Sequence, residues 1–215
     1  MPRFCDEHLD LLHSIDGLTR LSLSNTATTE NGLKKLIGLK KLNTLILSGT
    51  ETTDIGMADI AQLEGLTVLS LGGTKITDEG IKAIKSLTRL THLDVCETAI
   101  TDEGLKQICE FSNLTSLALK GAKVTDTGAN EIHRLTQLRQ LYLGDTQITD
   151  ACLKVIASLP NLTDLELTGT SVTDDGLNEL SRLKELRILS LAGTDTTKTG
   201  IEQLKKAFPE LHIER

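Results

Sequence analysis

The chain has 215 residues, a formal net charge of -7 at pH 7, 39% hydrophobic residues and only 2% aromatic residues. The negative charge argues against a general nucleic-acid-binding surface, and no apolar run approaches the ~20 residues that a membrane-spanning helix requires. Because aromatic residues are so scarce, we expect a core of aliphatic side chains.

The N-terminal segment, residues 1–17, has the pattern of half a repeat. Leu9, Leu12 and Ile15 have the spacing of the inward stripe of a short helix, and each lies 24 residues before an equivalent aliphatic residue. We favour a cap helix over Leu9–Ile15, although the segment also fits a chain cut from a longer array. It lacks a basic region followed by an apolar stretch, so we expect no signal peptide and a cytoplasmic protein.

Leucine then recurs every 24 residues through residues 18–207. The frame L-x-x-L-x-L-x-x-T-x-I-T-D-x-G-L occurs in eight copies without insertion or deletion, beginning at Leu18, Leu42, Leu66, Leu90, Leu114, Leu138, Leu162 and Leu186. Self-similarity at such a period indicates a solenoid, in which each repeat buries its apolar face against its neighbours.

One repeat predicts one strand followed by one short helix. In "LTVLSL" the alternation directs Leu66, Leu69 and Leu71 inward. Thr77 stands where an N-cap hydroxyl can accept a hydrogen bond from the first turn of the helix. Asp78 follows in that first turn, where the helix dipole favours negative charge.

A glycine occupies the third helical position of nearly every repeat, although glycine inside a helix costs roughly 0.5–1 kcal/mol relative to alanine. The column is Gly32, Gly56, Gly80, Gly104, Gly128, Gly176 and Gly200. We interpret it as a point where neighbouring coils approach too closely for a Cβ atom. The sixth copy has Cys152 instead, so we expect looser packing there.

Threonine follows most strands, in the column Thr26, Thr50, Thr74, Thr98, Thr146, Thr170 and Thr194. We interpret these hydroxyls as partners for backbone groups of the turning chain. They are not predicted to be nucleophiles, because no histidine accompanies the row as a base. Cys5, Cys96, Cys109 and Cys152 occupy four different repeat positions, which predicts free thiols rather than a disulfide framework or a zinc site.

The phrases "ITDEGL", "ITDACL" and "VTDDGL" resemble the leucine-rich repeat family, and most closely its cysteine-containing subclass. The resemblance extends from residue 9 to about residue 213. It implies an α/β fold, a curved right-handed solenoid with a parallel β-sheet on the concave face and short helices on the convex face. It also implies that the concave face holds another macromolecule. Residues 208–215 leave the repeat register by one position, and we expect them to form a C-terminal cap stub within a single domain of residues 1–215.

The outward strand positions supply the candidate site. Tyr142 is the only tyrosine in the chain and is surrounded by acidic positions, a combination typical of an interface anchor. The candidate partner-binding residues are His92, Asp94, Glu97, Tyr142, Asp145, Asp164 and Glu166. A secondary apolar patch is predicted at Ile46 and Val68.

These patterns favour a non-catalytic scaffold that binds a protein partner of unknown identity. An open sheet offers no cleft to shift the pKa of a carboxylate, so we expect no enzyme, and likewise no cofactor and no metal site. We expect a monomer that binds neither nucleic acid nor membrane. The alternatives are the substrate-recognition part of a larger adaptor and an extracellular recognition module.

Overall fold

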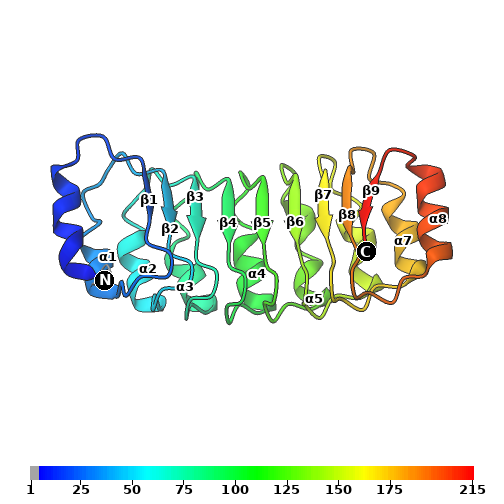
Figure 1. Cartoon of the computed structure of the whole chain (residues 1–215), viewed down its shortest axis with the longest axis horizontal. Helices are drawn as coiled ribbons and strands as arrows, with labels where there is room; N and C mark the ends of the chain where they lie inside the picture. The colour runs from blue at the N-terminus through cyan, green and yellow to red at the C-terminus, as the bar shows by residue number, and fades with distance from the viewer. Residues whose placement is uncertain (1–4) are drawn as a thin grey trace.

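The computed structural model describes residues 5–215, and these form one nine-stranded parallel sheet in the order β1 to β9. The strands succeed one another along the array (Figure 1). Each strand has three residues: β1 (Arg20–Ser22), β2 (Thr44–Ile46), β3 (Val68–Ser70), β4 (His92–Asp94), β5 (Ser116–Ala118), β6 (Gln140–Tyr142), β7 (Asp164–Glu166), β8 (Ile188–Ser190) and β9 (His212–Glu214).

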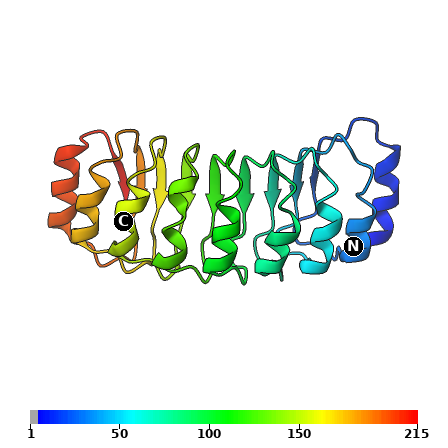
Figure 2. The same cartoon turned by 180° about the vertical axis from the view of Figure 1, so that it is seen from behind.

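Short helices cover the opposite face of the sheet (Figure 2). The α-helices are α1 (Glu30–Lys34), α2 (Asp54–Ile60), α3 (Asp78–Ala83), α4 (Asp102–Ile108), α5 (Asp126–Ala129), α6 (Leu153–Ile156), α7 (Asp174–Leu180) and α8 (Lys198–Ala207). The 3₁₀-helices are η1 (Asp6–Ser14), η2 (Ile132–Arg134) and η3 (Asp150–Cys152). Helices are wider than the ~4.8 Å between strands, so the sheet lies on the concave side. The predicted α/β solenoid is confirmed, and within residues 5–215 no helix is long and apolar enough to cross a membrane.

The core is an aliphatic column between the sheet and the helices. In the third coil Leu66, Leu69 and Leu71 are each 0% exposed, and Val68 and Ser70 between them are partly exposed. Equivalent residues of successive strands pair in a register of 24, for example Leu69 with Leu93. The period of the sequence therefore becomes the register of the sheet.

The N-terminal half-coil covers α1, and its described residues, from Cys5 on, form no strand before β1. The predicted helix is present as η1, which stacks on α1 with Leu9 fully buried. It is a 3₁₀-helix rather than an α-helix, and it leaves Leu11 68% and Ile15 50% exposed. Residues 1–4 of the predicted cap lie outside the described residues.

The C-terminal stub forms a ninth strand. His212 pairs with Ile188 and Glu214 with Ser190, so the strand keeps the register of 24 although the leucine at Leu211 is displaced by one residue. Ser190 Oγ donates a hydrogen bond to the Glu214 carboxylate at 2.7 Å. The end of the sequence thus completes the sheet and covers β8.

Successive helices are joined by hydrogen bonds from a threonine N-cap to the aspartate of the preceding coil. Thr101 is representative: its backbone N–H donates to Asp78 Oδ1 at 2.9 Å, and its hydroxyl donates to Asp78 Oδ2 at 2.6 Å. The full set of such pairs is Asp6–Thr29, Asp54–Thr77, Asp78–Thr101, Asp102–Thr125, Asp126–Thr149, Asp150–Thr173 and Asp174–Thr197. We call this row the Asp–Thr ladder.

The ladder gives the acidic column a second role besides its interaction with the helix dipole. Each carboxylate uses both oxygens to bind the next coil, and each threonine also accepts from its own helix, as Thr101 does from Glu103 N–H at 3.3 Å. Hydrogen bonds with an ionised partner contribute about 1.5–3 kcal/mol each. Between α1 and α2, Glu30 replaces the aspartate, and its Oε1 accepts a hydrogen bond from the Thr53 hydroxyl at 2.7 Å.

The glycine column faces this ladder, as the close-approach interpretation predicted. A Cβ atom at Gly104 would overlap Asp78 Oδ1, and a Cβ at Gly128 would lie 2.5 Å from Asp102 Oδ1 and 2.8 Å from Asp102 Cα. The helix tolerates glycine here because the carboxylate of the preceding coil occupies the place of the side chain.

The copy with Cys152 solves the same contact differently. The first turn there is the 3₁₀-helix η3, and α6 begins only at Leu153. Cys152 is 0% exposed, so the substitution opens no path to solvent, and the expected looser packing stays a prediction. The Cβ is accommodated by a change in the helical turn.

The threonines that follow the strands satisfy backbone carbonyls within their own coil. The Thr74 hydroxyl donates to the Leu71 carbonyl at 2.6 Å, and Thr50 and Thr98 repeat this bond three residues back along the chain. The interpretation of this column as a structural element of the turn is confirmed.

We predict that Gly104→Ala lowers the free energy of unfolding by about 1–3 kcal/mol, because the added Cβ displaces the Asp78 carboxylate that binds Thr101. The loss should occur even though alanine favours a helix over glycine by about 1 kcal/mol. Urea denaturation measures the effect, with Lys106→Ala on the exposed face of α4 as the control. A Gly104→Ala protein as stable as the control would show that the close approach is not limiting.

We also predict that the ladder makes the protein sensitive to acid. Burial acts to raise the pKa of Asp126, but hydrogen bonds from Thr149 and Cys152 outweigh it and hold the pKa below its ordinary 3.8. Since the folded pKa is depressed, the stabilisation is present above pH 3.8 and is lost as the pH falls below it.

The difference between the urea midpoints at about pH 6 and about pH 3 should therefore be smaller for Asp126→Asn than for the wild type. The control is Asp175→Asn, because Asp175 is an exposed acid of a first helical turn outside the ladder. Equal pH dependence in the wild type and Asp126→Asn would contradict the expected role of this carboxylate.

Candidate functional site

A hollow of about 480 Å³ opens on the concave sheet face between β4 and β7. Its lining residues are Asp94, Cys96, Ala118, Lys120, Tyr142 and Glu166. Ala118 on β5 lies directly beside Tyr142 on β6, and Tyr142 lies beside Glu166 on β7. The small alanine therefore leaves a depression, and the half-buried tyrosine forms one wall of it.

The electrostatics of the hollow are dominated by carboxylates around one lysine. Lys120 Nζ lies 3.3 Å from Asp145 Oδ2, and this contact raises the pKa of Lys120, with smaller contributions from the charges of Glu166 and Glu97. Both members of the pair are about half exposed, so the pair itself stabilises the fold little. The lysine remains charged, and the excess of carboxylates leaves the hollow acidic.

Glu97 and Asp145 both occupy a backbone conformation that favours glycine. Each has φ of 53°, and the equivalent residues of the other coils are Asn25 and the glycines Gly49, Gly73, Gly121, Gly169 and Gly193, all with positive φ. The glutamate side chain extends over Gly121 of the next coil, and the aspartate side chain extends over Gly169. Left-handed backbone costs a non-glycine residue roughly 1–2 kcal/mol, and such strain is typical of functional positions.

Asp94 and Glu166 are more constrained than the sequence suggested. Asp94 accepts hydrogen bonds from the Ser70 hydroxyl at 2.6 Å and from Cys96 N–H at 3.0 Å. Glu166 accepts from Gly144 N–H at 2.8 Å and from Thr168 N–H at 3.0 Å. These carboxylates therefore bind the turns at the strand ends as well as contributing charge to the hollow.

Tyr142 has the environment of an anchor held in place by its neighbours. Partial burial, followed by the charges of Asp164 and Glu166, raises the pKa of Tyr142 above its ordinary value. The phenol consequently stays protonated at neutral pH and presents a hydroxyl donor beside the acidic rim.

His92 and Asp164 lie at the opposite end of their strands from the hollow. His92 Nδ1 is 2.9 Å from the Thr91 hydroxyl, and Asp164 Oδ2 accepts from the Thr163 hydroxyl at 2.5 Å. The register sets His92 beside Val68 and Ser116, and Asp164 beside Gln140 and Ile188. The seven predicted residues thus divide between the N-terminal and the C-terminal ends of the strands.

The predicted apolar patch of Ile46 and Val68 is a diagonal pair. Val68 is directly beside Thr44, and Ile46 is directly beside Ser70, so polar side chains separate the two on their adjacent strands. Both residues are partly exposed. They offer a smaller apolar surface than two laterally paired residues would.

The chemical groups of the hollow are poorly suited to nucleophilic or metal chemistry. Burial, together with the nearby Asp94 charge, raises the pKa of the Cys96 thiol to about 12, so it stays protonated. Across residues 5–215, no group of three or more histidine, cysteine, aspartate or glutamate side chains has the arrangement of a metal site.

Sequence reasoning omitted three lining residues, Cys96, Ala118 and Lys120, from the candidate site. Ala118 and Lys120 were visible as outward or post-strand positions, and the repeat register alone aligns Ala118 with Tyr142. Their shared hollow could have been found by looking for a small residue beside the single tyrosine.

Comparison with known proteins identifies the architecture. A family model described as a leucine-rich repeat region matches residues 17–213. The crystal structure of internalin inlF from Listeria monocytogenes is similar with a TM-score of 0.67 and 22% identity, over 92% of this chain and 60% of that chain. Internalin C2 (inlC2) from the same organism is similar with a TM-score of 0.71 and 28% identity, over 93% of this chain and 80% of that chain. No curated protein matches the sequence significantly.

We predict that Glu97→Gly stabilises the protein by up to about 1 kcal/mol, because glycine relieves the strain of the left-handed backbone in the folded state. Glycine also makes the unfolded chain more flexible, and this effect offsets only part of the stabilisation. Thermal and urea unfolding measure the change. Glu103→Gly is the matched control, since Glu103 is an exposed helical residue and its replacement should be destabilising. A Glu97→Gly protein less stable than the wild type would refute the assignment of strain.

Proposed function

The chain belongs to the leucine-rich repeat family, and on that premise we propose that it is a non-catalytic module that binds a protein partner on its concave sheet face. Solenoids of this family commonly serve as protein-interaction scaffolds. The observation that carries the proposal is the hollow around Tyr142, the one tyrosine of the chain: Asp94 and Glu166 line it, and its Lys120 pairs with the strained Asp145.

The shape and side chains of the hollow support a protein ligand. A depression of about 480 Å³ open to solvent can receive one or two side chains of a partner. Tyrosine provides a large contact area at a low entropic cost and is enriched among residues that dominate binding energy. The flanking strands are short and pair with one another in one continuous parallel sheet, so we expect the face to change little in shape on binding.

The charge of the hollow defines the chemistry of the partner. Asp94, Glu97, Asp145 and Glu166 outnumber Lys120, so a basic side chain of the partner is the natural complement. Asp145 already pairs with Lys120, and an incoming arginine or lysine would compete for that carboxylate. We therefore propose a partner that inserts a basic or basic–aromatic segment and binds a monomer of this chain.

Tyr142→Ala should weaken binding of such a partner by about 2 kcal/mol or more, mainly by accelerating dissociation. The experiment captures a partner with the wild-type chain, identifies it, and measures its affinity for each purified variant by surface plasmon resonance. Tyr142→Phe should bind nearly normally if the ring supplies the contact area.

Val68→Ala is the matched control on the same face, because Val68 is partly exposed but lies outside the hollow. The charge-removing pair Glu97→Gln and Asp145→Asn should mainly slow association and reduce its salt dependence. A partner that binds Tyr142→Ala normally but loses affinity for Val68→Ala would transfer the site to the patch at Ile46 and Val68.

A further inference from the structure

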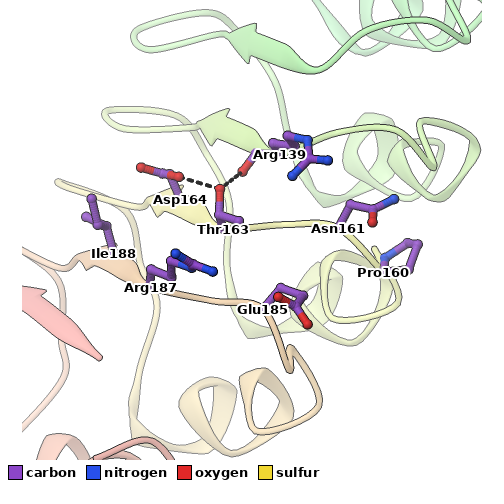
Figure 3. Close-up of a pocket in the computed structure, with 8 residues that line it drawn as sticks. All are labelled: Arg139, Pro160, Asn161, Thr163, Asp164, Glu185, Arg187 and Ile188. Carbon is purple, nitrogen blue, oxygen red and sulfur yellow. Dashed lines mark hydrogen bonds between the residues drawn. The ribbon is translucent and has the colours of Figure 1, made fainter. Parts of the chain in front are cut away.

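A second hollow, of about 540 Å³, lies at the edge of the sheet where the chain enters the strands. Arg139, Thr163 and Arg187 precede β6, β7 and β8 respectively and line it together with Asn161 (Figure 3). The two guanidinium groups lie on the same side of β7 as Asn161 (Figure 3), and Asp164 also lines the hollow. The hollow thus has two cationic walls with a threonine between them.

The backbone holds the two arginines at a defined separation. Thr163 N–H donates to the Arg139 carbonyl at 2.8 Å, and Arg187 N–H donates to the Thr163 carbonyl at 2.8 Å. The arginines therefore stand roughly 10 Å apart at the backbone, which is twice the distance between neighbouring strands. Two long side chains starting at this separation can reach one group placed above Thr163.

Both guanidinium groups are available to a ligand. Across residues 5–215 neither one forms an ion pair, although the chain carries a net charge of -7. Asp164 is bound to the Thr163 hydroxyl instead. Asp164 and the exposed Glu185 also line the hollow, and the charges of both carboxylates oppose the binding of an anion.

We propose that Arg139 and Arg187 together bind the carboxylates of an acidic segment in the protein partner. The proposal rests on the proposed function and specifies the charge pattern of the partner: its basic segment faces the hollow at Tyr142, and its acidic segment faces the arginines. Guanidinium groups bind carboxylates through two parallel hydrogen bonds, which fixes orientation as well as charge. The two sites meet across β7, so together they determine the direction in which the partner lies on the sheet.

The test uses the full ¹⁵N-labelled chain and short synthetic peptides at low ionic strength, where exposed charges are least screened. A glutamate-rich peptide should produce saturable NMR shifts at Arg139, Thr163 and Arg187. Arg139→Gln and Arg187→Gln should each weaken this binding by about fivefold or more. Arg89→Gln is the matched control, an exposed single arginine at the same edge, and Glu185→Gln should tighten binding.

A lysine-rich peptide is titrated in parallel and reports on the hollow at Tyr142. Suppose that the lysine-rich peptide shifts Tyr142 but the glutamate-rich peptide gives no saturable shift at Arg139 or Arg187. That result would overturn the arginine site and leave the proposed function standing. Saturable binding of the glutamate-rich peptide that is unchanged in Tyr142→Ala would support the arginine site independently. Two results would overturn the assignment to an acidic protein segment: equal losses in the Arg89→Gln control, or tighter binding of inorganic phosphate than of the peptide.

Discussion

The hydrogen bonds between each threonine N-cap and the aspartate of the preceding coil are the constraint on which the structure depends. Parallel strands advance by about 4.8 Å per coil, and the helices must keep pace although they are wider. The ladder draws the helix starts together, since one carboxylate accepts from both the backbone and the hydroxyl of the next coil. The glycine at the third helical position follows from it, because the carboxylate fills the space that a Cβ would need.

This division of labour leaves the sheet face free to vary. The core columns, the ladder and the turn threonines repeat nearly unchanged from coil to coil, whereas the outward positions vary widely among the strands. Solenoid stability is approximately a sum of repeat and neighbour terms, so a local departure is tolerated when the adjoining coils are sound. Glu97 and Asp145 are such departures, since five of the other coils have glycine at this position and one has asparagine. Both lie near Lys120, a lining residue of the hollow around Tyr142, so the strained turns border the proposed binding site.

The charges of the face are organised along the strand direction. Carboxylates gather where the strands end, around Lys120, and the unpaired arginines stand where the strands begin. A partner of uniform charge would meet repulsion at one of these edges, which disfavours binding in the wrong orientation. The proposed mode of binding therefore uses the separation of charge along the strands to orient the partner.

The 24-residue period by itself determined the parallel sheet, its register, the aliphatic core and the threonine caps, because each depends on local periodicity that every copy repeats. It also located Tyr142 and the acidic positions on the outward face, and it explained the glycine column as a close approach. Only the tertiary structure decided which groups meet. The link from Asp78 to Thr101 spans 23 residues, and the engagement of Glu166 by two backbone amides depends on turn geometry that no single repeat encodes. The hollow at Ala118 and the placement of Arg139 and Arg187 around one hollow both arise between coils. They depend on the size and direction of side chains on neighbouring strands, which the order of residues along one repeat does not specify.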